Sequence, residues 1–173
     1  MKTLLTSLAL LAAAFTLHAE IKTETIEYKE GDTTLEEERM LKAYFASLVA
    51  EDEGFALLEA AASVAQDEYP TLDTQTVLAE IDRLGARLRA RLPADAPALH
   101  RLRALNRYFF GELGFAGNVN DYYDRRNSYL NDVLASRRGI PITLALLYAE
   151  LAAQAGLTAR GVSFPGHFLV KLR

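Results

Sequence analysis

The stretch that decides the fold lies in the last third of the chain and reads Asn127-Ser-Tyr-Leu-Asn-Asp-Val-Leu-Ala-Ser-Arg-Arg-Gly-Ile-Pro-Ile-Thr-Leu-Ala-Leu-Leu-Tyr-Ala-Glu-Leu151. Pro141 suits the first position of a helix, where the missing N–H of proline costs no hydrogen bond. An apolar stripe at helical spacing follows, made of Leu144, Leu147, Tyr148 and Leu151. Gly156 stands where a helix commonly ends on a glycine. The stretch therefore predicts an apolar helix from Pro141 to about Gly156.

Two strands are predicted after this helix. Ala159–Ser163 and Phe168–Leu172 have strand-like composition, and Phe164-Pro-Gly joins them as a turn. His167 opens the second strand. We therefore expect a small antiparallel sheet at the C-terminus.

The middle of the chain is predicted to be helical. Asp73 is a plausible N-cap for the third of four expected helices. The fourth begins after Pro97 and is expected to turn Leu99, Leu102, Leu105, Phe109 and Leu113 inward. The expected helices are Glu37–Val49, Phe55–Ala65, Thr74–Leu92 and Ala98–Leu113. The fold class is thus α+β, dominated by helices, with a small C-terminal antiparallel sheet.

Composition excludes several classes of chemistry. The chain has 173 residues, a formal net charge of -4 and no cysteine. Disulfides, thiolate metal sites and thiol nucleophiles are therefore excluded within it. No histidine pair has metal spacing and no glycine-rich phosphate loop occurs, so we expect neither a metal nor a cofactor. The acidic balance argues against non-specific nucleic-acid binding.

Seven arginines between residues 83 and 107 form the most basic region. One interpretation is a face for an acidic protein partner or a nucleic acid. The other, which we favour, is a solvated face whose arginine stems cover apolar surface. The residues are Arg83, Arg87, Arg89, Arg91, Arg101, Arg103 and Arg107.

The front of the chain has the pattern of an export signal. Lys2 precedes an apolar run, and Ala19 stands at the expected cleavage point, so Met1–Ala19 is interpreted as a signal peptide. The run is too short for a stable membrane span. Residues 20–36 alternate in polarity around Gly31-Asp32 and predict a short hairpin. A buried N-terminal helix is the alternative to the signal peptide.

Two resemblances follow from these segments. The leader and hairpin resemble the start of exported dienelactone-hydrolase-like proteins. Further along, a distinctive series of motifs is formed by Tyr108–Asn118, Asp121-Tyr-Tyr-Asp124, Asn127–Asn131, Arg137–Thr143 and Phe164–His167. On these motifs, the chain from about Glu38 to Arg173 resembles the SirB-type transglutaminase-like domain, which has a papain-type core. We therefore interpret the chain as a possible chimera, with 37–113 as the helical part and 114–173 as the core-like, truncated part of that domain.

The second resemblance implies where catalytic residues would lie. Active members carry a cysteine at the start of the central helix, at or next to Pro141, where Thr143 offers the nearest hydroxyl. His167 matches the catalytic histidine and is interpreted as a relic base. The acid that orients it would lie beyond Arg173. The candidate binding residues beside the glycine turn are Asn127, Tyr129, Asn131 and Arg138, which are also interpretable as loop-capping residues.

The expected function is therefore a non-catalytic protein-interaction or regulatory module on a transglutaminase-like fold, with an unidentified protein partner. The alternatives are a hydrolase or peptidase-like enzyme of altered chemistry that uses His167, and a truncated, fused gene product without independent function. The leader implies a periplasmic or secreted protein. The SirB-type resemblance, whose bacterial members usually precede TPR-type repeats, implies a cytoplasmic one. Related domains occur in some eukaryotic F-box proteins.

Overall fold

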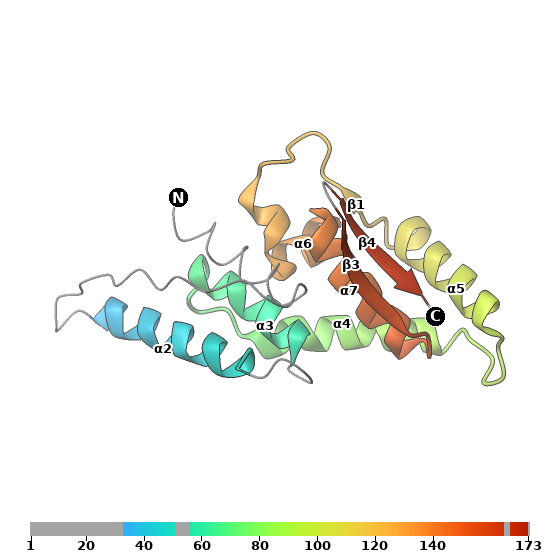
Figure 1. Ribbon diagram of the computed structural model, residues 1–173, viewed down its shortest axis with the longest axis horizontal. Helices are drawn as coiled ribbons and strands as arrows, with labels where there is room; N and C mark the ends of the chain where they lie inside the picture. The colour runs from blue at the N-terminus through green and yellow to red at the C-terminus, as the bar shows by residue number, and fades with distance from the viewer. Residues whose placement is uncertain (1–32, 51–55, 165–166, 173) are drawn as a thin grey trace. The chain divides into compact units, whose positions relative to one another are not determined.

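The computed structural model describes residues 33–50, 56–164 and 167–172 (Figure 1). The chain divides into two compact units, Met1–Leu72 and Asp73–Arg173. The predicted signal peptide and residues 20–32 of the predicted hairpin lie outside the described residues. No helix in the described part is long and apolar enough to cross a membrane.

The described part of the first unit contains two α-helices and a short 3-10 helix. Helix α2 spans Thr33–Leu48, α3 spans Leu57–Ser63 and η1 spans Val64–Asp67. The hydroxyl of Tyr44 donates to Oε1 of Glu59 at 2.5 Å, which ties α2 to α3. The hairpin prediction was wrong at residues 33–35, which form the first turn of α2. Three glutamates follow directly, and their helix propensity outweighs the strand preference of the threonines.

The second unit begins with two helices that follow the sequence pattern closely. Helix α4 spans Thr74–Arg89, and the carboxylate of Asp73 accepts a hydrogen bond from the N–H of Gln75, which confirms the predicted N-cap. Helix α5 spans Ala98–Asn106 and continues as a π-helix, η2, over Arg107–Glu112.

The inward orientation predicted for Leu99 was wrong, because its side chain is 57% exposed. At 3.6 residues per turn, Leu105 and Phe109 lie close together around the helix, whereas Leu99 lies about 100° away from them. Leu105 and Phe109 are buried, as predicted.

The rest of the second unit surrounds helix α7, Pro141–Gln154 (Figure 1). Before it come the 3-10 helix η3, Arg125–Ser128, and helix α6, Leu130–Ser136. Strand β1, Ala116–Gly117, pairs in parallel with β2, Arg138–Gly139. Strand β3, Ala159–Phe164, pairs antiparallel with β4, His167–Leu172, and both contact α7. The predicted α+β class with a small C-terminal antiparallel sheet is confirmed.

Helix α7 forms the core because its apolar stripe meets aromatic side chains from η2. Leu147 and Leu151 are almost fully buried. The ring of Phe109 stacks on Phe115 at 4.5 Å and meets Tyr148 edge-on at 5.3 Å, measured between centroids. Such aromatic contacts stabilise the fold by more than the burial of their apolar area alone.

The predicted glycine at the end of α7 is confirmed. Gly156 has φ 78°, its N–H bonds the carbonyl of Ala153, and the N–H of Leu157 bonds that of Ala152. This pair of hydrogen bonds is a Schellman motif, which requires a left-handed residue and therefore favours glycine.

Candidate functional site

Helix α7 begins at a tightly packed corner. Ile140 is extended, with φ -82° and ψ 162°, and Pro141 occupies the first turn as predicted. Gly139 precedes it in β2, and a Cβ there would lie 2.8 Å from Oγ1 of Thr143 and 3.1 Å from the methyl groups of Val133. The close approach of α6 and α7 therefore requires glycine at this position.

Asn127 connects this corner to the loop that precedes η3. It is buried, and its amide nitrogen donates to the carbonyls of Asp121 at 2.8 Å and Tyr122 at 3.2 Å. Its amide oxygen accepts from Nδ2 of Asn118 at 3.0 Å. Both N–H groups and the oxygen of this buried amide are satisfied, so removal of the side chain would break three contacts at once.

The backbone carbonyl of Asn127 extends the same network into α7. It accepts the hydroxyl of Thr143 at 2.8 Å and the N–H of Ile140 at 3.2 Å. The Thr143 hydroxyl also lies 3.0 Å from the carbonyl of Ile140, and the residue is fully buried. A nucleophile must reach its substrate and have a base beside it. The carbonyl groups around Thr143 accept its proton in a hydrogen bond but cannot remove it.

The loop anchored in this way exposes apolar and aromatic groups. We call residues 118–124 the tyrosine loop. Val119 is 87% exposed, Tyr122 55% and Tyr123 93%, and the two tyrosine rings meet edge-on at 5.4 Å. These three side chains give the tyrosine loop an exposed apolar and aromatic surface.

An ion pair closes the C-terminal end of the tyrosine loop. The carboxylate of Asp124 accepts from the backbone N–H of Arg126 at 3.0 Å and from its guanidinium at 2.7 Å. The guanidinium and this N–H lower the pKa of Asp124. Asp124 thus acts as the N-cap of η3.

The other predicted binding residues frame the tyrosine loop. Tyr129 is buried and Asn131 half-buried, so neither offers much surface to a ligand. Arg138 is exposed, and its guanidinium donates to the carbonyls of Gly114 at 2.7 Å and Arg137 at 3.0 Å. The roles of these three residues in binding stay predictions. The contacts observed for Arg138 are those of a residue that holds a loop.

His167 is the first residue of β4 and pairs with Phe164 across the turn. Its side chain lies outside the described part of the structure, so its role as a relic base stays a prediction. In the described residues no group of acidic and histidine side chains is arranged to hold a metal ion.

Two residues that form hydrogen bonds within the tyrosine loop were not predicted from the sequence. Asn118 and Asp121 belong to the quoted motif but were not singled out, although their spacing around Asn127 permits the observed hydrogen bonds. Two consecutive aromatic residues within a polar segment were the available signal for exposure at Tyr122 and Tyr123.

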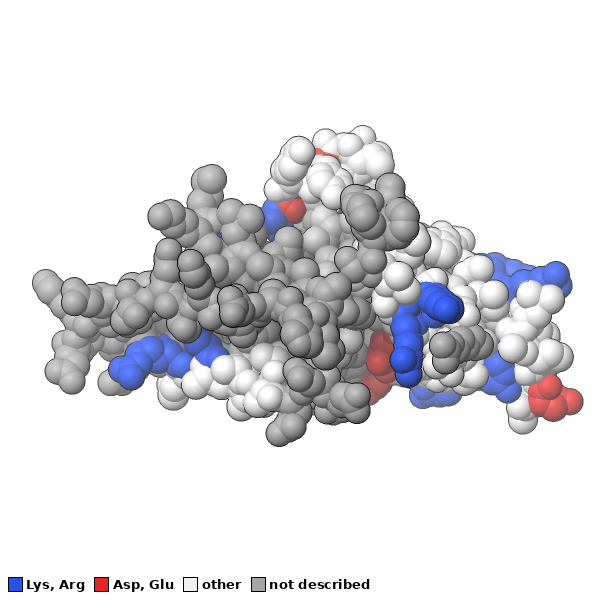
Figure 2. Space-filling view, viewed as in Figure 1, with Lys and Arg blue, Asp and Glu red and all other residues white. Residues whose placement is uncertain are grey.

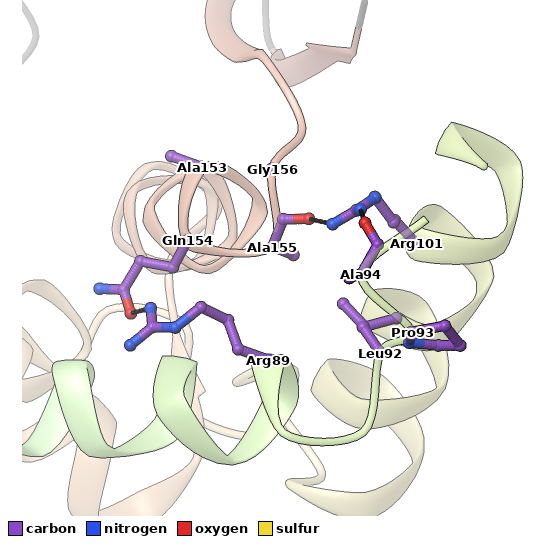
Figure 3. A pocket seen from close by; sticks show the side chains of 9 residues that line it. All are labelled: Arg89, Leu92, Pro93, Ala94, Arg101, Ala153, Gln154, Ala155 and Gly156. Atoms are coloured by element: carbon purple, nitrogen blue, oxygen red, sulfur yellow. Dashed lines mark hydrogen bonds between the residues drawn. The ribbon is translucent and has the colours of Figure 1, made fainter. Parts of the chain in front are cut away.

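A shallow pocket of about 290 Å³ lies at the other end of α7 (Figure 3). Arg101 fills one side and donates to the carbonyls of Ala94, Ala96 and Ala155. Arg89 reaches the side chain of Gln154 at 2.7 Å. A guanidinium on the last carbonyls of a helix interacts favourably with the helix dipole, so the bond from Arg101 to the Ala155 carbonyl stabilises the end of α7.

Comparison with known proteins identifies the family of the chain. The model of the transglutaminase-like superfamily matches residues 75–173. The chain belongs to the transglutaminase-like superfamily. The match contains the tyrosine loop and α7.

Relatives with known sequences extend the comparison. A UPF0162 protein of Xylella fastidiosa is 40% identical over 136 residues, which cover 79% of this chain and 48% of that protein. A UPF0162 protein of Pseudomonas aeruginosa is 35% identical over 68% of this chain and 43% of its own length. F-box only protein 21 of Homo sapiens is 44% identical over 70 residues, 11% of its length. The chain spans about half the length of the UPF0162 proteins it matches. No solved structure matches.

Proposed function

We propose that the chain is a non-catalytic protein-interaction module on a SirB-type transglutaminase-like domain, and that the tyrosine loop is its recognition element. The observation that carries the proposal is the combination of exposure and anchoring. Val119, Tyr122 and Tyr123 are among the exposed large apolar side chains, while Asn127 fixes the backbone beneath them.

Anchoring matters because binding costs less when the recognition loop is already ordered. Immobilising a mobile side chain costs about 0.5–1.5 kcal/mol, and a preformed loop avoids part of that cost. Tyrosine supplies a large contact area with few rotatable bonds, which is why it is enriched at protein interfaces. The tyrosine loop combines both properties.

The non-catalytic part of the proposal is supported by the start of α7. The chain contains no cysteine, and the residues at this helix start are Pro141, Ile142 and Thr143. Thr143 is buried with its hydroxyl donated to carbonyls. A screen for peptide, ester and transamidation turnover tests this part. Activity that is lost in both His167→Ala and Thr143→Ala would establish the enzymatic alternative instead.

Site-specific photo-crosslinking tests the interaction. A photoreactive phenylalanine analogue replaces Tyr123 in one variant and the exposed Ala135 of α6 in the control. We expect a discrete adduct from position 123, absent from position 135 and lost when Val119 and Tyr122 are changed to serine. Mass spectrometry identifies the adduct, and calorimetry with the purified partner measures its affinity. Equal crosslinking from both positions, or none, would contradict the proposal.

A further inference from the structure

The β3–β4 hairpin has an outer face built from two side-chain pairs. Register places Arg160 opposite Lys171 and Val162 opposite Leu169. Residues two apart in a strand point to the same side, so all four share one face, which we call the outer hairpin face. All four are exposed, with Val162 at 37% and Leu169 at 52%. The opposite side of the hairpin is half-buried, and α7 contacts both strands.

The cationic pair is electrostatically unfavourable by itself. Like charges directly opposite each other in an antiparallel ladder lie about 5 Å apart at Cβ and destabilise the pairing. Within the described residues, neither Arg160 nor Lys171 forms an ion pair with a carboxylate. Figure 2 shows basic side chains over the part of the molecule where the open end of the hairpin lies, near the C-terminus marked in Figure 1, with acidic side chains beside them. An anionic group between the two cations would relieve their repulsion.

The spacing of the two pairs matches an extended peptide. Neighbouring pairs on one face of a hairpin are two residues apart, about 6.6–6.8 Å. In an extended ligand, side chains at positions i and i+2 are separated by the same distance. A carboxylate and an aliphatic side chain at such positions would meet the cationic pair and the Val162–Leu169 pair together.

We propose that the outer hairpin face docks an extended acidic segment of a partner protein, in which acidic and aliphatic side chains alternate along one face. The carboxylates lie between Arg160 and Lys171, and the aliphatic groups cover Val162 and Leu169. A protein segment is favoured over a nucleic acid because the apolar pair is aliphatic, whereas single-stranded nucleic acids stack on aromatic rings. The inference rests on the proposed interaction function but uses residues other than the tyrosine loop.

Fluorescence anisotropy with the full chain tests the proposal. The probe is a labelled peptide of about eight residues with the repeat Glu-Ser-Val-Ser, matched to the length of a short strand. We expect saturable binding that weakens with added salt. The double variant R160E/K171E should bind about tenfold less tightly, as two exposed charge contacts are lost and reversed. A peptide with the repeat Lys-Ser-Val-Ser should gain affinity for that variant.

The control is a variant with the same change in net charge as R160E/K171E, placed elsewhere on the chain. The variant R87E/R103E changes two exposed arginines that form no ion pair with described residues. The affinity of R87E/R103E for the probe should stay within about twofold of that of the natural chain. The variant V162S/L169S should bind the probe more weakly, and thermal unfolding should show that this variant is folded. Equal loss in R87E/R103E would overturn the proposal, because overall charge would then explain binding. An oligothymidylate that binds more tightly and competes at the same residues would also overturn it.

One further variant separates this inference from the proposed function. Tyr122→Ser combined with Tyr123→Ser should leave probe affinity unchanged, because the outer hairpin face contains neither tyrosine. If that variant abolished probe binding, the outer hairpin face would not be a separate site. If the probe bound nowhere while crosslinking from position 123 succeeded, this inference alone would fail.

Discussion

The hydroxyl of Thr143 lies 2.8 Å from the backbone carbonyl of Asn127 and donates a hydrogen bond to it. This contact joins the first turn of α7 to the residue whose side chain holds the tyrosine loop. The start of the central helix and the exposed loop are therefore parts of one hydrogen-bonded network. A change at either residue is expected to affect both.

The first prediction concerns the buried hydroxyl. Thr143→Val keeps the shape of the side chain but removes the donor to Asn127, so the free energy of unfolding should fall by about 1–2 kcal/mol. Thr143→Ser keeps the donor and should lose only the contribution of one methyl group, about 1 kcal/mol or less. Urea unfolding measures both. A valine variant as stable as the natural chain would show that the hydrogen bond contributes nothing net.

Asn127→Ala should destabilise the chain by about 2 kcal/mol, since three hydrogen bonds of a buried amide are lost. It should also speed amide hydrogen exchange at residues 119–123, whose backbone loses its support. Asn131→Ala is the matched control, because Oδ1 of Asn131 has no hydrogen-bond partner within the described structure. If the two variants lost equal stability and left exchange unchanged, Asn127 would not be the anchor.

Two glycines paired across β1 and β2 should differ in how well they tolerate alanine. Gly139→Ala places a methyl group 2.8 Å from Thr143 and 3.1 Å from Val133. Overpacking of this kind costs about 1–3 kcal/mol. Its register partner Gly117 has nothing within 4 Å, so Gly117→Ala should change stability by less than about 0.5 kcal/mol. Thermal unfolding of both variants gives the comparison, and similar midpoints would contradict it.

The last prediction concerns pH and Asp124. The interaction with Arg126 lowers the pKa of Asp124 in the folded chain, so its charged form stabilises the fold above the unfolded pKa, about 4. This contribution is lost as pH falls through the folded pKa. Asp124→Asn retains a capping oxygen but not the charge. The variant should be less stable than the natural chain at about pH 6, with the difference shrinking toward about pH 3. A constant difference would exclude the charge as its source.

The fold was predictable to a large extent because its elements obey local rules. Asp73 before α4, Pro141 at the start of α7 and Gly156 after its end each mark a helix boundary by their own backbone or capping chemistry. The β3–β4 pairing was predictable from the composition of the two segments and from the Pro-Gly sequence between them.

The rest depends on contacts between distant residues. The β1–β2 pairing involves two residues from each strand, too few to leave a periodic pattern. Burial of Thr143 follows from packing of α6 and η3 around the helix start, which residue type alone does not reveal. The tyrosine loop was visible as a motif, but its anchoring by Asn127 required the hydrogen-bond geometry.

The parallel pairing of β1 with β2 has a consequence for protein engineering. The backbone enters the segment after Gly117 and leaves it at Arg138 at neighbouring points of one ladder, where Ala116 faces Arg138. The segment therefore begins and ends side by side and carries its main anchor, Asn127, within itself. Because the ladder already holds the two ends together, a change in the length of this segment does not require β1 and β2 to move apart.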